Sequence, residues 1–162
     1  MKTILTIYFL PVLLFAGNDS LTGVWQDRNY PGSVWGNTYM FYPTGEFRFY
    51  FSQTDCSKRI VSYSGSWSLA EEEVIDLMIT SKTLIEGGKL VPSTGNCASD
   101  SMIVGGDMKV LVLYVPEKMD LSISRIYKDN DGDIQRDVIY IDGMKFWKFG
   151  NNPDDFIRYF EK

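Results

Sequence analysis

The sequence contains no histidine. Histidine is the base of the Ser-His-Asp and Cys-His nucleophile systems and a frequent ligand of zinc and haem. Its absence argues against most familiar hydrolase mechanisms and against His-ligated centres, so we expect a protein that is not an enzyme and uses no cofactor or metal ion. Catalysis by paired carboxylates stays open as an alternative. Acids available for it include Glu46, Asp76, Asp107 and Asp137.

Positive charge is also in the minority. The chain has 16 Lys and Arg residues against 21 Asp and Glu residues, which gives a formal net charge of −5 at pH 7. A chain with this balance lacks the basic surface that attracts nucleic acids and anionic membranes. We therefore expect no nucleic acid among its partners.

The N-terminus carries an apolar run that is too short to span a bilayer. Lys2 precedes the run from Ile4 to Ala16, which Pro11 interrupts, and a membrane span needs about 20 apolar residues. A positive charge, an apolar stretch and then small polar residues are typical of a secretory signal peptide. We predict a signal peptide over residues 1–16, a single domain over residues 17–162, and a secreted or periplasmic location without a membrane span. A buried N-terminal strand or helix of a non-exported protein is the alternative.

Cysteine is scarce, since Cys56 and Cys97 are the only two. In an exported chain, an even number of cysteines indicates a disulfide more often than a metal or catalytic site. A bridge between these two closes a loop of roughly 40 residues, for which the chain-entropy model gives roughly 4 kcal/mol of stabilisation. We predict a Cys56–Cys97 disulfide, with two free buried thiols as the alternative.

Helical periodicity is hard to find after the N-terminal run. Short runs of aromatic and β-branched residues are instead broken by Gly, Pro, Asn and Asp at intervals of about 8 to 12 residues. In the clearest strand, Phe47, Phe49 and Phe51 share one face. The apolar run Val110–Val115 predicts a strand covered on both faces. We expect an all-β fold, an antiparallel up-and-down β-barrel of about 8–10 strands, because closure removes exposed edges.

Two segments leave a choice of structure. Asp129–Asp133 predicts a hairpin turn and not an EF-hand calcium loop, because aligning Gly132 with the invariant glycine of that loop puts Tyr127 and Val138 where carboxylates are needed. Residues 156–160 predict the strand of a last hairpin. A short helix after Pro153 is the alternative, since two aspartates follow this proline.

The sequence Leu21-Thr22-Gly23-Val24-Trp25 resembles the Gly-x-Trp opening of lipocalins and other calycins. The runs Tyr39–Phe51 and Gly65–Leu69 resemble bacterial secreted lipocalin-like domains. The resemblance covers roughly the first half of the chain after the leader, and the second half shows no clear Thr-Asp-Tyr motif. It implies a lipocalin-like barrel with Trp25 closing one end, and a small hydrophobic or amphiphilic ligand bound inside without a catalytic step.

A barrel of this size admits one small ligand or is filled by its own side chains. Strand alternation places Arg125 and Tyr127 on the face of Leu121 and Ile123, where a guanidinium beside a phenol can hold a carboxylate by charge-assisted hydrogen bonds. The pair resembles the Arg-x-Tyr of fatty-acid-binding proteins; the alternative is an Arg125 that faces water. The other side chains predicted to face the interior, and thus a ligand, are Tyr39, Phe41, Phe47, Phe49, Tyr63, Trp67 and Tyr114.

Two functions follow from these patterns. The first is a carrier that holds a small apolar molecule inside the barrel. The second is an interaction or inhibitor module with a filled barrel, which acts through exposed loops such as Pro92–Asp100. An accessible interior favours the carrier, whereas a filled interior with a large exposed apolar patch favours the module.

Overall fold

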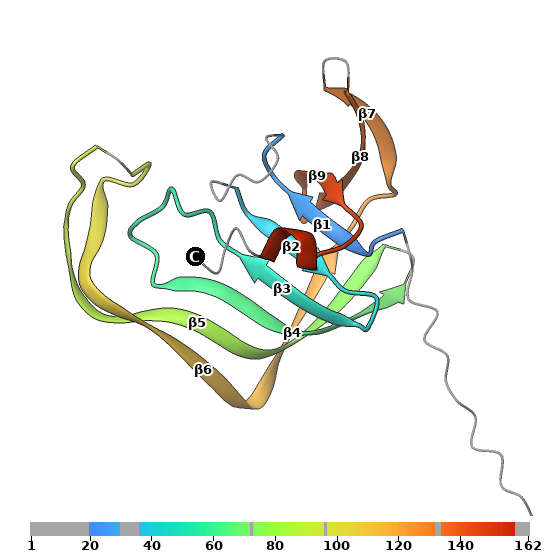
Figure 1. Cartoon of the computed structure of the whole chain (residues 1–162). Coiled ribbons are helices and arrows are strands. Elements are labelled where there is room, and N and C mark those ends of the chain that lie inside the picture. Colours follow the sequence, from blue (N-terminus) through green and yellow to red (C-terminus); the bar gives the residue numbers. More distant parts are fainter. Residues whose placement is uncertain (1–19, 30–35, 72, 96, 132–133, 158–162) are drawn as a thin grey trace, which may run out of the picture.

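The computed structural model describes residues 20–29, 36–71, 73–95, 97–131 and 134–157. The predicted signal peptide lies outside them. Within these ranges the chain is almost entirely β, which confirms the predicted fold class (Figure 1). The elements are β1 (Gly23–Gln26), β2 (Thr38–Phe41), β3 (Glu46–Tyr50), β4 (Ile60–Glu71), β5 (Val74–Pro92), β6 (Ser101–Ser122), β7 (Tyr127–Asp131), β8 (Ile134–Ile141), β9 (Met144–Gly150) and α1 (Asp154–Ile157).

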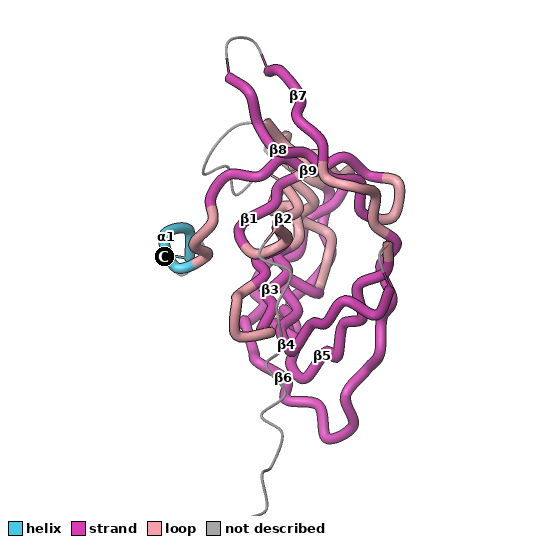
Figure 2. Tube along the Cα trace, turned by 90° about the vertical axis from the view of Figure 1, so that its right-hand side faces the viewer, coloured by secondary structure: helices cyan, strands magenta, loops and turns pink. Residues whose placement is uncertain are grey.

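The strands form one antiparallel sheet in the order β6-β5-β4-β3-β2-β1-β9-β8-β7. Strands β1 to β6 therefore follow one another as a meander, and β9 returns to pair with the other side of β1. Figure 1 shows the sheet curling strongly, with the long β5–β6 hairpin forming one wing and the β7–β8 hairpin projecting on the other side. Figure 2 shows the same wings from the side, with α1 set apart from the sheet.

The sheet is not closed into a barrel, which corrects the sequence-based expectation. The segment after β6 meets the end of β8 over only a few residues, through an isolated bridge between Ile123 and Ile141. The backbone N–H of Asp142 donates to the carbonyl of Ser122 at 2.9 Å beside it. The chain then turns into the β7–β8 hairpin, so no ladder continues along β6. The two edges of the sheet consequently stay separate.

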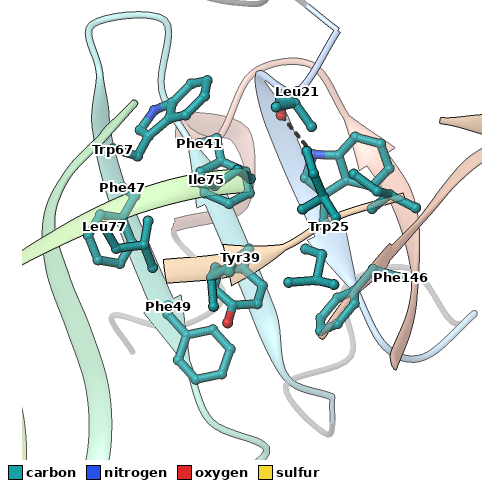
Figure 3. Packing of buried hydrophobic residues seen from close by; sticks show 14 of the residues in the cluster. Leu21, Trp25, Tyr39, Phe41, Phe47, Phe49, Trp67, Ile75, Leu77 and Phe146 are labelled. Atoms are coloured by element: carbon teal, nitrogen blue, oxygen red, sulfur yellow. Dashed lines mark hydrogen bonds between the residues drawn. The ribbon is translucent and has the colours of Figure 1, made fainter. Parts of the chain in front are cut away.

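Aromatic side chains fill the space inside the curl (Figure 3). Trp25, Phe41, Phe47 and Phe146 are at most 1% exposed, and the rings of neighbouring aromatic residues are in direct contact. Alternation in β3 explains this, because it directs Phe47 inward while Glu46 on the opposite face is exposed. Aliphatic residues from the other strands complete the core, namely Ile75, Leu77, Ile79, Leu121, Ile123, Ile139 and Ile141.

The structure decides between strand and helix after Pro153, and it describes the hairpin at Asp129–Asp133 only in part. Residues Asp154–Ile157 form the helix α1, so the alternative after Pro153 is right and the preferred strand is wrong for the described residues. Two aspartates in the first turn favour this helix start. In the hairpin, Asp131 pairs with Ile134, whereas residues 132–133 lie outside the described ranges. The turn type between them stays a prediction.

Candidate functional site

Most of the aromatic residues predicted to face a ligand form the packed core instead of lining a cavity. The ring centroid of Tyr39 lies 4.4 Å from that of Phe49 and 5.4 Å from that of Phe146. Burial raises the pKa of the Tyr39 phenol well above its ordinary value, so this group stays neutral. Phe41 and Phe47 are buried in the same cluster. Tyr63 is half-buried at its margin, where its ring stacks on Phe49.

Arg125 and Tyr127 lie away from this core. Ile123 is buried, but Arg125 is exposed and Tyr127 is 38% exposed. Strand β6 ends at Ser122 and the alternation stops with it, so the placement of the pair on the face of Ile123 is wrong. The Tyr127 ring stacks on Tyr140 at 6.2 Å, and a hydrogen bond between the two phenols raises the pKa of Tyr127. Carboxylate binding by this pair stays a prediction.

Tyr114 is also on the surface, fully exposed to solvent. The ladder between β5 and β6 passes from the pair Ile79–Glu117 to the pair Ser81–Val112. Residues 113–116 of β6 therefore face Thr80 alone and bulge out of the ladder. This bulge carries Tyr114 away from the core, which makes its predicted interior position wrong.

Strand β6 is the edge of the sheet and not a covered strand. It pairs with β5 on one side, and no strand in the described ranges pairs with its other side. Alternate residues of β6 direct their backbone N–H and C=O groups to that side. These groups therefore lack a strand partner. We call Val104–Val112 the open edge. Its large apolar side chains are exposed: Val104 40%, Met108 71%, Val110 69%, Leu111 48% and Val112 69%.

The Val110–Val112 part of the open edge lacks the features that usually prevent strands from pairing there. Natural edge strands carry Pro, bulges or several charges. Between Val110 and Val112 there is none of these, and the bulge of residues 113–116, which ends at Pro116, begins directly after Val112. The sequence does contain a signal for this arrangement, because a proline directly after a strand run indicates an edge position. The physical consequence is an apolar template for another strand.

Charges on the open edge are only partly balanced. Glu86 on β5 lies directly opposite Asp107 on β6, and like charges in such a pair repel. The Lys109 ammonium forms an ion pair with Glu86. No ion pair of Asp107 occurs within the described ranges. The Asp107 carboxylate is exposed at the edge and open to a cation from outside.

A pocket of about 310 Å³ lies beside the open edge. Its apolar wall includes Phe51, Val61, Ile85 and Met108, and Lys58 lies at the same pocket. The Lys58 ammonium is 5.0 Å from the centre of the Phe51 ring. The remaining lining residues are Ser52, Gln53, Asp55, Cys56 and Ile60. The pocket thus combines an apolar wall with polar groups from the β3–β4 loop.

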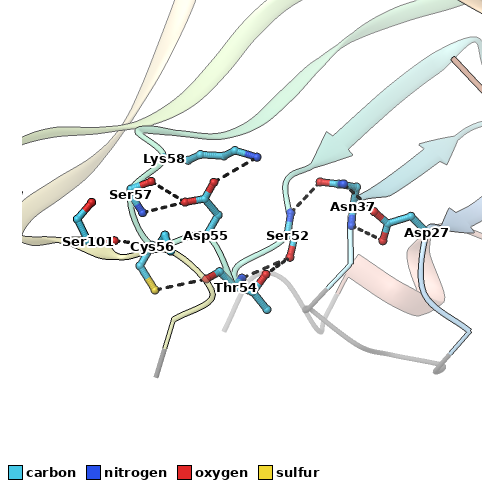
Figure 4. A network of polar contacts seen from close by, with 10 residues as sticks. Asp27, Asn37, Ser52, Thr54, Asp55, Cys56, Ser57, Lys58 and Ser101 are labelled. Carbon is cyan, nitrogen blue, oxygen red and sulfur yellow. Dashed lines mark hydrogen bonds and ion pairs between the residues drawn. The ribbon is translucent and has the colours of Figure 1, made fainter. Parts of the chain in front are cut away.

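The predicted disulfide is confirmed and holds this loop against the β5–β6 wing. Cys56 and Cys97 are bonded, with their Cα atoms 5.8 Å apart. The N–H of Ile103 donates to the carbonyl of Cys56 at 3.0 Å, and that of Ala98 to the carbonyl of Thr54 at 2.8 Å. Side-chain hydrogen bonds order the loop further (Figure 4). The loop and the wing are therefore one covalently linked unit.

Asp55 is the centre of the loop's hydrogen bonds. Its carboxylate accepts from the Ser57 hydroxyl at 2.6 Å and from the Ser57 N–H at 3.2 Å. These bonds, chiefly the one from the hydroxyl, lower the pKa of Asp55 below its ordinary 3.8. Lys58 adds an ion pair at 3.5 Å. The carboxylate is therefore ionised at neutral pH and stabilises the fold of the loop.

The described ranges contain no cluster of three or more His, Cys, Asp or Glu residues arranged to hold a metal ion. Within the same ranges, no helix has the length and apolar character needed to cross a membrane.

Comparisons with known proteins were made for the whole chain. No family model matches it, and no curated protein and no solved structure shows significant similarity.

Proposed function

We propose that this protein is a non-catalytic, exported interaction module, which binds a polypeptide by adding a strand to the open edge of β6. The observation that carries the proposal is the exposure of Val110 and Val112 on an unpaired strand edge. The packed interior adds support, because the aromatic side chains occupy the space that a carrier would leave for its ligand.

Strand addition uses both the backbone and the side chains of an edge. Main-chain hydrogen bonds provide affinity, and the side chains on the two faces select the sequence of the added strand. Here Met108, Val110 and Val112 share one face by alternation, and Leu111 lies on the other. The matching partner is an extended segment with apolar residues on the face that meets Met108, Val110 and Val112. Its binding removes several hundred Å² of apolar surface from water, which is the order of magnitude of a functional patch.

The proposal includes the setting in which the protein works. A disulfide in a small domain is typical of oxidising, extracellular or periplasmic compartments. The meander from β1 to β6 and the Gly-x-Trp sequence in β1 support a lipocalin-like origin of the domain. In this proposal Trp25 stabilises one end of the curled sheet.

A second candidate function is the binding of a small hydrophobic or amphiphilic molecule. The pocket beside the open edge favours it, because its volume of about 310 Å³ is at the lower end of small-molecule sites. Val61 and Ile85 would contact the apolar body of the ligand, and Lys58 its polar end. Titration with the dye 1-anilinonaphthalene-8-sulfonate tests this function. The fluorescence gain should be lost in Val61→Lys, and an unchanged gain would count against the pocket.

Peptide binding tests the leading proposal. The probe is a fluorescent peptide of alternating Thr and Val, flanked by lysines for solubility, and the readout is fluorescence anisotropy. The double variant Val110→Lys/Val112→Lys should lose binding at least tenfold, since charges would occupy the apolar edge.

The matched control is Ile134→Lys/Met144→Lys, which changes two similarly exposed apolar residues on β8 and β9. It adds the same charge and should leave binding unchanged. Equal binding by the wild type and both double variants would show that the open edge is not the binding surface.

A further inference from the structure

We infer that the strand added to the open edge is β6 of a second copy of this chain, in an antiparallel pair centred on Met108. The inference rests on the proposed function, because it names the partner of the same surface. The two copies would be related by a two-fold axis through the paired Met108 residues. Each copy would then present the same residues to the other, as in other isologous dimers.

The charges on the open edge select this register. In an antiparallel pair centred on Met108, Asp107 of one copy lies opposite Lys109 of the other. The two-fold symmetry produces this contact twice. Opposite charges in such cross-strand positions are stabilising and like charges are destabilising. Each ammonium would also supply the cation that Asp107 lacks beside Glu86. The pair therefore forms a small alternating network on one face of the joined sheets.

The neighbouring registers are disfavoured by the same rule. Hydrogen-bonding groups point outward on every second residue, so the centre of a two-fold pair moves along the strand one residue at a time. Centring on Asp107 would place two carboxylates opposite each other. Centring on Lys109 would do the same with two ammonium groups. Of these three registers, only the one centred on Met108 pairs opposite charges.

Side-chain sizes fit this register as well. Val110 of one copy comes opposite Gly106 of the other, so a branched side chain meets a residue without one. Leu111 comes opposite Gly105, where the space that a Cβ would occupy has no atom within 4 Å. Val112 reaches towards Val104, which is itself exposed. Apolar side chains thus meet either glycine or another apolar residue along the pair.

The exposed area sets the strength of the expected dimer. The five large apolar side chains of the open edge are 40–71% exposed. This corresponds to an area on the order of several hundred Å² per copy, close to the lower end of specific interfaces at about 600 Å² per partner. We therefore expect reversible association with a Kd in the micromolar range.

Sedimentation equilibrium of the full chain between 1 and 200 µM, as an order-of-magnitude range around the expected Kd, tests the inference. The variant Asp107→Lys places like charges across the interface and should weaken the dimer at least tenfold. Within one chain the new ammonium faces Glu86, so the monomer should unfold at no lower temperature than the wild type. This separates a broken interface from a damaged fold.

The swap Asp107→Lys/Lys109→Asp restores opposite charges in the same register and should recover the dimer. Glu73→Lys, at an exposed site between β4 and β5, is the control for a charge reversal and should dimerise like the wild type. An unchanged dimer Kd in Asp107→Lys would overturn the register. Failure of the swap to restore the wild-type Kd would overturn it as well.

The outcomes also separate this inference from the proposed function. A chain that stays monomeric at all concentrations but binds the alternating Thr and Val peptide overturns the second copy as partner, while strand addition stands. A chain that neither dimerises nor binds the peptide overturns both. The peptide is measured at protein concentrations well below the dimer Kd, so that self-association does not cover the edge.

Discussion

The indole Nε1 of Trp25 donates a hydrogen bond to the backbone carbonyl of Leu21 at 2.8 Å, and both residues are buried. The bond supplies the partner that a buried indole N–H requires. Gly23 lies between them, and a Cβ there would be 2.2 Å from the carbonyl oxygen of Gly150. The Gly-x-Trp sequence therefore has a structural explanation in this chain, since glycine permits close approach of β9 and tryptophan fills the core.

Replacing Trp25 by Phe should lower the free energy of unfolding by about 2–4 kcal/mol. The change removes core volume and leaves the Leu21 carbonyl without its donor. Urea denaturation followed by the remaining tryptophans measures the loss. Trp147→Phe is the matched control: its ring is half-buried, and the loss should be clearly smaller. Equal losses in the two variants would contradict the special role of Trp25.

Removing the disulfide should destabilise the protein by roughly 4 kcal/mol, because the bridge spans 41 residues of sequence and restricts the unfolded chain. Thermal unfolding of Cys56→Ser/Cys97→Ser, compared with the wild type, measures the change. The wild type with reductant should unfold like the double variant, and reductant should not affect the variant itself. If reductant left the unfolding temperature of the wild type unchanged, the bridge would contribute little to stability.

Gly65→Ala should be severely destabilising, by about 3 kcal/mol or more. An added Cβ at this position would lie 1.9 Å from the Met78 carbonyl oxygen, where the β4–β5 ladder shifts register. The adjacent Ser66→Ala changes an exposed side chain and should have an effect within about 0.5 kcal/mol. Urea midpoints of the two variants give the comparison. Similar midpoints would mean that the strands do not approach so closely at Gly65.

The Asp55 carboxylate should make stability depend on pH in the acid range. Its pKa is lowered in the folded state, so its contribution is present above the ordinary value of 3.8 and is lost as the pH falls through the folded pKa. Asp55→Asn should therefore melt roughly 1–3 °C lower than the wild type at pH 7. The difference should shrink as the pH falls below 3.8. Asp100→Asn, at an exposed site, is the control, and a constant difference between pH 7 and pH 2 would contradict the argument.

Much of the core could be predicted from local pattern. The inward direction of Phe47 and Phe49 follows from two-residue alternation, which any strand of that sequence shows. Close approach at Gly65 also has a local signal, because a glycine within a strand lets another backbone come near. The candidate site was not predicted. The run Val110–Val115 has the composition of a covered strand, yet it is exposed because no strand follows β6 in the sheet.

The sequence by itself determined that the chain is built from strands, which side chains of the first strands point inward, and which cysteines pair. These properties depend on neighbours along the chain and on the even number of thiols. The tertiary structure alone decided that the sheet stays open, that Tyr114 and Arg125 face solvent, and that the apolar run of β6 forms an edge. An edge is defined by the strand that is absent beside it. That absence depends on the order of all strands in space, which no local periodicity contains.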